Sequence, residues 1–148
     1  MTERDETALP QHLYRWLESV LLRVSREFDA VIDHEVARLG HRRLRIVQLI
    51  PPGGIRQQAL AERALVTKQA IATLVDHLET DGLVLRTPDP EDGRAWLVRR
   101  TEAGDRISDA ADRAMVEVEQ RLARDVGATR YAEFRSALET IGQNPDTA

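Results

Sequence analysis

The spacing of apolar residues changes abruptly at Gly82, and few folds accommodate that change. From Lys68 to Thr80 the apolar side chains recur at the three-four spacing of one helix face. The runs 83–87 and 95–100 are instead rich in residues that suit β-strands. The segment 88–94 between them holds two prolines, which we expect to end the first strand, and an Asp-Gly pair that favours a turn. The sequence therefore predicts a helix followed directly by a β-hairpin with a long tip.

A second short helix is expected from Gln57 to Ala64, joined by a tight turn to the helix that begins at Lys68. Ala61 is small where the two helices approach closest, which permits a steep packing angle. Thr67 is the expected N-cap of the second helix. Leu65 occupies the turn position where glycine is common, because a left-handed backbone costs a side chain ~1 kcal/mol or more. The spacing predicts a helix-turn-helix, and the sequence leaves open whether its turn is built differently.

Further helices are expected on both sides of this motif. A Pro-Pro-Gly-Gly run at 51–54 separates it from a short helix over 42–50. One long helix is expected over 11–39, and its apolar stripe exceeds what one small domain covers, so part of it should meet a second chain. Another long helix should begin at 102, and a last one should follow from about 129 to 141.

These elements predict a mainly α protein with a winged helix-turn-helix, built from about six helices and one β-hairpin. We expect residues 1–148 to form a single domain. Within it, 11–39 and 102–142 should form a helical dimerisation region, and 42–101 should form the DNA-binding lobe.

Charge and composition limit the possible partners. The formal net charge is -4, yet the stretch 41–101 carries ten Arg or Lys against seven Asp or Glu, so a mildly basic centre lies between acidic ends. The absence of cysteine excludes disulfides and thiolate metal sites. The N-terminus lacks the pattern of a signal peptide, and the chain lacks a run of ~18 apolar residues. We therefore expect a cytoplasmic protein without membrane contact.

Two segments resemble the MarR family of multiple-antibiotic-resistance regulators. They are ALAERALVTKQAIATLVDHLETDGL at 59–83 and LVLRTPDPEDGRAWLVRRTEAG at 83–104, and the resemblance covers most of the chain. The most specific parts are Asp92-x-Arg94 and Thr101-Glu102-Ala103-Gly104, in which Thr101 caps the next helix. The resemblance implies that Arg94 enters the minor groove of DNA, with Asp92 supporting the wing through a charge pair. A narrow groove concentrates negative potential, which suits an arginine.

Two residues depart from the family pattern, and the remaining polar residues suggest how DNA would be read. Arg100 stands where the family usually has leucine, and Thr73 where it often has a basic residue. The face of the second helix opposite its apolar stripe should meet the major groove, and it presents Lys68, Gln69, Ala72, Thr73 and Asp76. Thr67, at the start of this helix, is a further candidate DNA contact. Arg56, Gln57 and Arg86 are better placed for phosphates. The alternative for each is an exposed side chain without a role.

The leading hypothesis is a homodimeric transcription regulator, usually a repressor in this family, on a palindromic operator with half-sites ~34 Å apart. A small ligand, such as an aromatic acid, would release it, with His12, Arg15 and Trp16 as candidate contacts. The apolar stripe that contains Trp16 favours core or interface over a ligand contact for this residue. The alternative is a winged-helix scaffold for protein interactions without DNA binding. No catalytic motif appears, and neither the acidic cluster 89–92 nor His34 with His41 has metal-ligand spacing, so we expect no enzyme, cofactor or metal.

Overall fold

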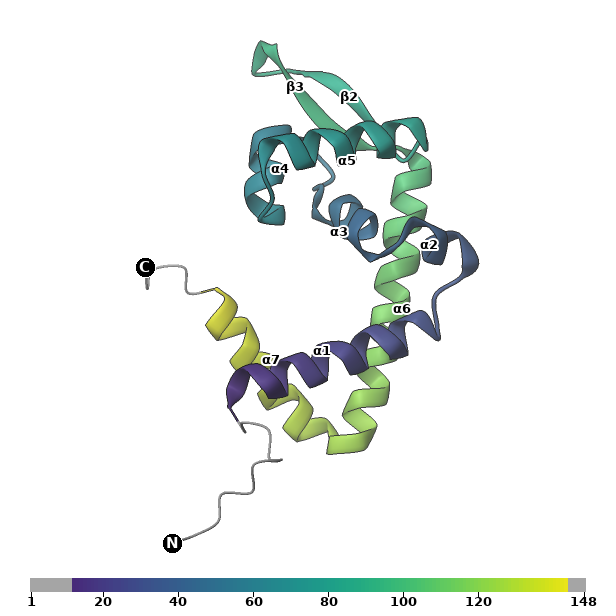
Figure 1. The fold of residues 1–148 in the computed structure, drawn as a ribbon, viewed down its shortest axis with the longest axis vertical. Coiled ribbons are helices and arrows are strands. Elements are labelled where there is room, and N and C mark those ends of the chain that lie inside the picture. The colour runs from purple at the N-terminus through teal and green to yellow at the C-terminus, as the bar shows by residue number, and fades with distance from the viewer. Residues whose placement is uncertain (1–11, 144–148) are drawn as a thin grey trace, which may run out of the picture. The chain divides into compact units, whose positions relative to one another are not determined.

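The computed structural model describes residues 12–143, which form seven helices and a three-stranded sheet (Figure 1). The helices are α1 Leu13–Asp29, α2 His34–Leu39, α3 His41–Leu49, α4 Gln57–Ala64, α5 Lys68–Thr80, α6 Glu102–Val126 and α7 Ala128–Gly142. The strands are β1 Ile55–Arg56, β2 Val84–Asp89 and β3 Asp92–Arg100. No helix within this part of the chain is both long and apolar enough to span a membrane.

The chain divides into two compact units. The central unit comprises residues 32–116 and contains α2 to α5, the sheet and the first part of α6. The terminal unit comprises residues 1–31 and 117–148, and its described part contains α1, the end of α6 and α7. The helix α6 thus contributes residues to both units.

The core of the central unit lies beneath the helix-turn-helix. Most of its fully buried side chains come from α3, α4, α5 and the sheet, and α2 and α6 add one each: Val36, Val47, Ile50, Leu60, Ile71, Val75, Leu78, Val98 and Ala111. Helices α4 and α5 have the bounds expected from the sequence, and the Thr67 hydroxyl accepts the Ala70 N–H at 3.1 Å as the predicted N-cap. Because one face of each helix forms the core, the opposite face of α5 remains exposed.

The turn between α4 and α5 keeps the left-handed geometry that glycine usually supplies. Leu65 has φ 55° and ψ 45°, and it is 85% exposed. The Leu65 N–H donates to the carbonyl of Glu62 at 3.1 Å, and the Val66 N–H donates to that of Ala61 at 3.1 Å. The turn is therefore built in the usual way, and the leucine carries the conformational cost.

The hairpin differs from the sequence prediction in two ways. The expected end of the first strand at the prolines is wrong, because β2 continues through Pro88 to Asp89, with an irregularity between those two residues. The sheet order is β1-β3-β2, so β2 is an edge strand, where a proline without an N–H is tolerated. The tip is consequently short. The second difference is β1, which the sequence analysis did not predict and which pairs Ile55 with Val98.

The start of α6 fits tightly against Gly82 and Leu83, which follow α5. The Thr101 hydroxyl donates to the Gly82 carbonyl at 2.7 Å and accepts the Gly104 N–H at 3.1 Å, as its expected capping role requires. A Cβ atom on Gly104 would overlap the carbonyl oxygen of Leu83, so only glycine fits there. Arg100 finds an acidic partner in Asp105, at 2.7 Å.

The expected single helix over 11–39 is wrong. Helix α1 ends at Asp29, and α2 begins at His34 after a break in which the Asp33 carboxylate accepts the Val36 N–H at 2.9 Å. Asp33 is a strong N-cap, and it favours a new start over continuation. The predicted first residue, Gln11, lies outside the described residues.

Ion pairs join the helices of the terminal unit, in which Phe28 and Val118 are buried. Arg121 of α6 pairs with Glu27 of α1 at 3.0 Å, and Arg135 of α7 pairs with Glu119 of α6 at 3.3 Å. Many of its large apolar side chains are exposed: Leu13, Tyr14, Trp16, Leu17, Val20, Leu21, Leu22, Val126, Phe134, Leu138 and Ile141. Helix α7 has no buried residue.

Candidate nucleic-acid interface

Helix α5 presents a polar outer face opposite its buried one. Lys68, Gln69 and Thr73 are exposed, and Ala72 is half-buried among them. The Thr73 hydroxyl donates to the Gln69 carbonyl at 3.2 Å, which leaves its methyl group for outward apolar contact. The face predicted to read bases is therefore exposed, with an ammonium, an amide and two methyl groups side by side.

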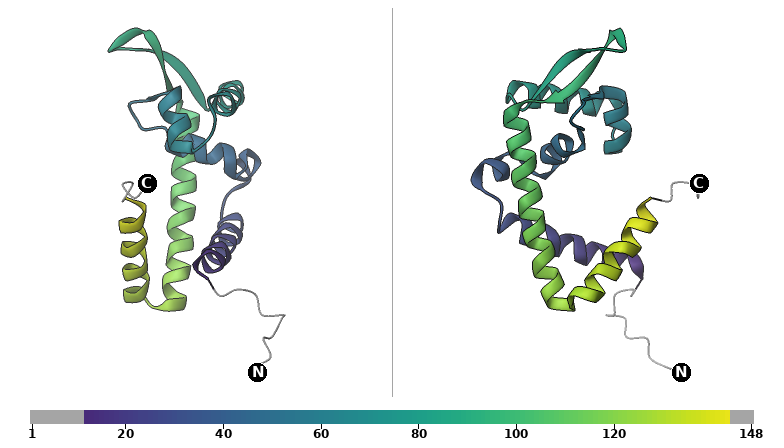
Figure 2. Two further views of the ribbon diagram at one scale, coloured as in Figure 1. Left: turned by 60° about the vertical axis from the view of Figure 1, so that its left-hand side comes forward. Right: turned by 180° about the vertical axis from the view of Figure 1, so that it is seen from behind.

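The β2–β3 hairpin extends beyond the helices of the central unit (Figure 2). Arg94 lies near its tip and is exposed, and its guanidinium has no hydrogen-bond or ion-pair partner among residues 12–143. The backbone N–H of Arg94 donates to the Asp92 carboxylate at 3.2 Å. Asp92 thus supports the wing through the backbone of Arg94, while the arginine side chain is free to reach a ligand.

A second acidic residue, Asp89, anchors the base of the wing tip. It is only 7% exposed, and its carboxylate accepts from Nε and Nη2 of Arg56 at 2.8 and 2.7 Å. Arg56 also lies 3.6 Å from Asp92. Arg56, expected to contact phosphate, thus joins β1 to the hairpin while its side chain remains half exposed.

The environment of Asp89 stabilises its charged form. The pKa of Asp89 lies below its ordinary value, because the Glu91 N–H donates to its carboxylate at 2.9 Å and Arg56 pairs with it. The sequence analysis considered Asp89 only as part of an acidic cluster. An aspartate whose side chain can bond the backbone two residues later is a turn signal that could have identified it. Within the described residues, no group of three or more His, Cys, Asp or Glu is arranged to hold a metal ion.

Arg86 of β2 is bound to α5. Its Nη2 lies 2.6 Å from Asp76 Oδ1 and 3.3 Å from Gln57 Oε1, and its Nη1 pairs with Glu79. Its backbone N–H also donates to Glu79, at 3.3 Å. Burial is the largest single influence on the pKa of Arg86 and lowers it, but the hydrogen bonds and charges of Asp76 and Glu79 together raise that pKa above its ordinary value. Two residues expected to contact phosphate, Arg86 and Gln57, therefore hydrogen-bond to each other at the partly exposed surface.

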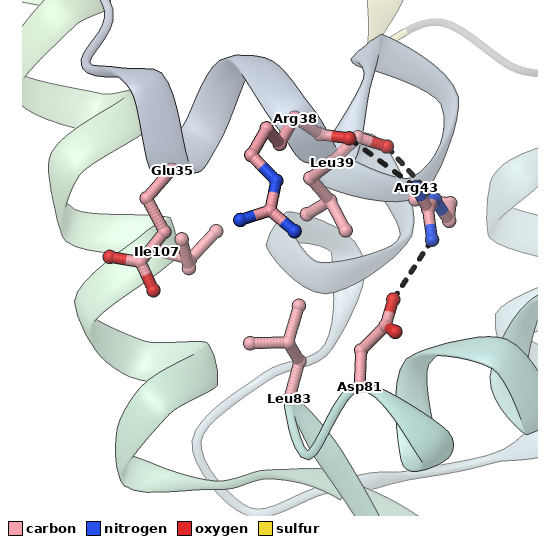
Figure 3. A pocket seen from close by; sticks show the side chains of 7 residues that line it. All are labelled: Glu35, Arg38, Leu39, Arg43, Asp81, Leu83 and Ile107. Atoms are coloured by element: carbon pink, nitrogen blue, oxygen red, sulfur yellow. Dashed lines mark hydrogen bonds and ion pairs between the residues drawn. The ribbon is translucent and has the colours of Figure 1, made fainter.

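A small pocket lies on another side of the central unit, between α2, α3, the end of α5 and α6 (Figure 3). Its volume is about 260 Å³, and its lining mixes both charges with apolar side chains: Glu35, Arg38, Leu39, Arg43, Asp81, Leu83 and Ile107. Arg43 forms one wall, with Nη1 2.8 Å from Asp81 Oδ2 and Nε donating to the Leu39 carbonyl at 2.9 Å.

The residues expected to bind an effector lie elsewhere, near the start of α1. His12 and Trp16 are exposed and Arg15 is half-buried. None of the three lines the pocket in Figure 3, the neighbouring pocket beside Asp109, or the pocket of the terminal unit beside Arg23. The structure thus places the candidate effector residues on the surface of α1.

Comparison with known proteins gives consistent matches. A model of the MarR family matches residues 41–95. The transcriptional regulator HosA of Escherichia coli O111:H- is 34% identical over 92 residues, which are 62% of this chain and 68% of HosA. The HTH-type transcriptional repressor IacR of Pseudomonas putida is 26% identical over 152 residues, covering 97% of this chain and 85% of IacR.

A solved structure agrees with the fold as well. The crystal structure of CouR from Rhodococcus jostii RHA1 bound to p-coumaroyl-CoA is 27% identical, with a TM-score of 0.66, and the match covers 94% of this chain and 99% of CouR. The matches confirm the winged helix-turn-helix architecture predicted from the sequence.

Proposed function

The chain belongs to the MarR family of transcriptional regulators, and from this premise we propose that it binds double-stranded DNA as a homodimer. Its relatives are regulators rather than enzymes. The observation that carries the proposal is that the outer face of α5 and the free guanidinium of Arg94 belong to the same compact unit. A helix face can read base edges in the major groove, while an arginine on a hairpin can enter the adjacent minor groove.

The contacts divide into two kinds under this proposal. Lys68 donates to guanine, Gln69 pairs with adenine, and the methyl groups of Ala72 and Thr73 contact thymine methyl groups. Thr67 and the N-terminus of α5 lie where a phosphate oxygen is favoured by the unpaired N–H groups of the first turn. The exposed edge of Arg56 and the amide of Gln57 add contacts to the backbone of the duplex, which set the register without specifying sequence.

The second copy is needed to cover the terminal unit. The exposed apolar side chains of α1 and α7 form more apolar surface than a small monomeric unit usually leaves in water. Burying them against the same segments of a second chain produces a two-fold dimer, whose two recognition helices match a palindromic operator. Sedimentation equilibrium should find a dimer at micromolar concentration, and a monomer would contradict this part of the proposal.

Repression and release by a small molecule complete the proposal. IacR is named a repressor, and CouR binds p-coumaroyl-CoA in its crystal structure. We place the effector near His12, Arg15 and Trp16 at the start of α1, where the sequence offers an exposed indole ring and an arginine. A panel of aromatic acids and their coenzyme A thioesters should include a compound that raises the unfolding temperature and weakens DNA binding. Trp16→Ala should abolish that shift, and an unchanged shift would place the effector elsewhere.

DNA binding is tested on duplexes recovered from a randomised pool by repeated selection with the full chain. Arg94→Ala and Lys68→Ala should each weaken binding by roughly 1–3 kcal/mol, because each removes one groove contact. Arg106→Ala is the matched control, since Arg106 is also an exposed arginine of the central unit but pairs with Glu102 on α6. If the selection recovers no preferred sequence, the scaffold alternative without DNA binding is favoured.

A further inference from the structure

The recognition helix carries two carboxylates on the side where DNA would lie. Asp76 and Glu79 belong to α5, are both exposed, and follow the predicted base-reading positions of the same helix. A carboxylate that faces phosphates is repelled by them, because like charges a few ångströms apart repel each other even in water. A helix with this composition is a poor DNA ligand unless its acids are neutralised.

Arg86 is the group that neutralises them. Its guanidinium reaches both acids from β2, at 2.6 Å from Asp76 Oδ1 and in an ion pair with Glu79. The same Nη2 atom also engages the acceptor oxygen of Gln57. At least three of the donor hydrogens of Arg86 are thus directed at protein acceptors, and its side chain is only 28% exposed.

We propose that Arg86 acts on DNA affinity by masking Asp76 and Glu79, rather than by contacting a phosphate itself. Arg86 is then a positioning residue: it converts an acidic stretch of the recognition helix into a surface that tolerates the phosphate backbone. The inference rests on the proposed DNA-binding function, and it replaces the phosphate contact predicted for Arg86 from the sequence.

Three variants separate masking from two other roles of Arg86, which are a direct phosphate contact and a purely structural clamp between β2 and α5. They are Arg86→Ala, the double variant Asp76→Asn/Glu79→Gln, and the triple variant that combines all three changes. Affinity is measured for the selected duplex at one low salt concentration, and folding is checked by the urea midpoint of each variant. Arg106→Ala serves as the control for loss of a paired arginine away from α5.

Masking predicts one pattern of affinities. Arg86→Ala should bind about tenfold more weakly, because two uncompensated carboxylates then face phosphates. The double variant should bind at least as tightly as the unaltered protein, and the triple variant should bind as tightly as the double variant. The penalty of removing Arg86 thus disappears once the acids are gone, which is a coupling that a double-mutant cycle measures.

Each other outcome overturns the inference. A direct phosphate contact would leave the triple variant as weak as Arg86→Ala, while the double variant stays tight. A purely structural clamp between β2 and α5 would weaken all three variants, because each lacks the ion pairs. If the unaltered protein selects no duplex, the proposed function fails, and the masking role fails with it.

Discussion

The two compact units differ in where their apolar side chains lie. In the central unit the large apolar residues of α3, α4 and α5 are buried, and the exposed surface is mainly polar. In the terminal unit α7 buries nothing, and α1 leaves side chains such as Trp16 and Leu21 at 58% and 66% exposure. The central unit buries its own core, whereas the terminal unit leaves many large apolar side chains exposed.

The two units also use their ion pairs differently. In the central unit, ion pairs hold functional elements in place: Arg56 with Asp89 at the wing, and Arg86 with Asp76 at α5. In the terminal unit, Arg121 and Arg135 join helices whose apolar faces point elsewhere. Ion pairs thus position the hairpin and α5 in the central unit, and they join helices in the terminal unit.

The largest expected effect is on the free energy of unfolding, and a matched pair of leucine substitutions tests it. Leu60→Ala, in the core of the central unit, should lower the free energy of unfolding by about 2–5 kcal/mol because it leaves a cavity. Leu21→Ala, on exposed α1, should change it by less than ~0.5 kcal/mol in a dilute sample. Urea unfolding followed by circular dichroism measures both.

The same Leu21→Ala variant sharpens the comparison through association. It should raise the dissociation constant of the proposed dimer about tenfold, because it removes apolar surface that association would bury. Leu65→Ala, another exposed leucine but in the central unit, should leave that constant unchanged. Equal effects of Leu21→Ala and Leu65→Ala in analytical ultracentrifugation would contradict the assignment of the terminal unit as the dimer surface.

Gly104→Ala tests how tightly the central unit is packed. The added methyl group would overlap the Leu83 carbonyl oxygen, so the variant should lose about 1–3 kcal/mol of unfolding free energy. Gly142→Ala, at the end of α7, meets no atom within 4 Å and should cost nothing comparable. The two urea midpoints give the comparison, and a tolerated Gly104→Ala would mean that the α6 start can move.

Leu65→Gly should stabilise the protein, by about 1 kcal/mol. Leu65 has a left-handed backbone that costs a side chain energy, and its exposed side chain contributes little packing in return. A rise in the thermal midpoint with unchanged DNA affinity is the expected result. A fall in that midpoint would show that the Leu65 side chain contributes packing after all.

The smallest effect is the pH dependence of the wing. The folded protein holds the pKa of Asp89 below its ordinary value, so its stabilising contribution is complete above the unfolded pKa, near ~4, and is lost as the pH falls through the lower folded value. Unfolding midpoints measured between pH 6 and pH 3 should therefore fall more steeply in the unaltered protein than in Asp89→Asn. Parallel curves would mean that Asp89 is not an anchor.

The sequence predicted the features that depend on neighbouring residues. The bounds of α4 and α5, the Thr67 and Thr101 caps and the hairpin after Gly82 follow from apolar spacing and from side chains that bond the backbone three residues away. The outer face of α5 follows as well, because a buried stripe on a helix defines the exposed one. The family motifs at 92–94 and 101–104 identified the wing for the same reason, since each is short and local.

Only the tertiary structure decided which distant groups meet. Pro88 is tolerated because β2 is an edge strand, and the strand order is not visible in a local pattern. The sequence predicted phosphate contacts for Arg56 and Arg86, and the folding of the hairpin and of α5 brings a carboxylate to each of them. A side chain's charge is written in the sequence, but its availability depends on which opposite charge the folded chain places beside it.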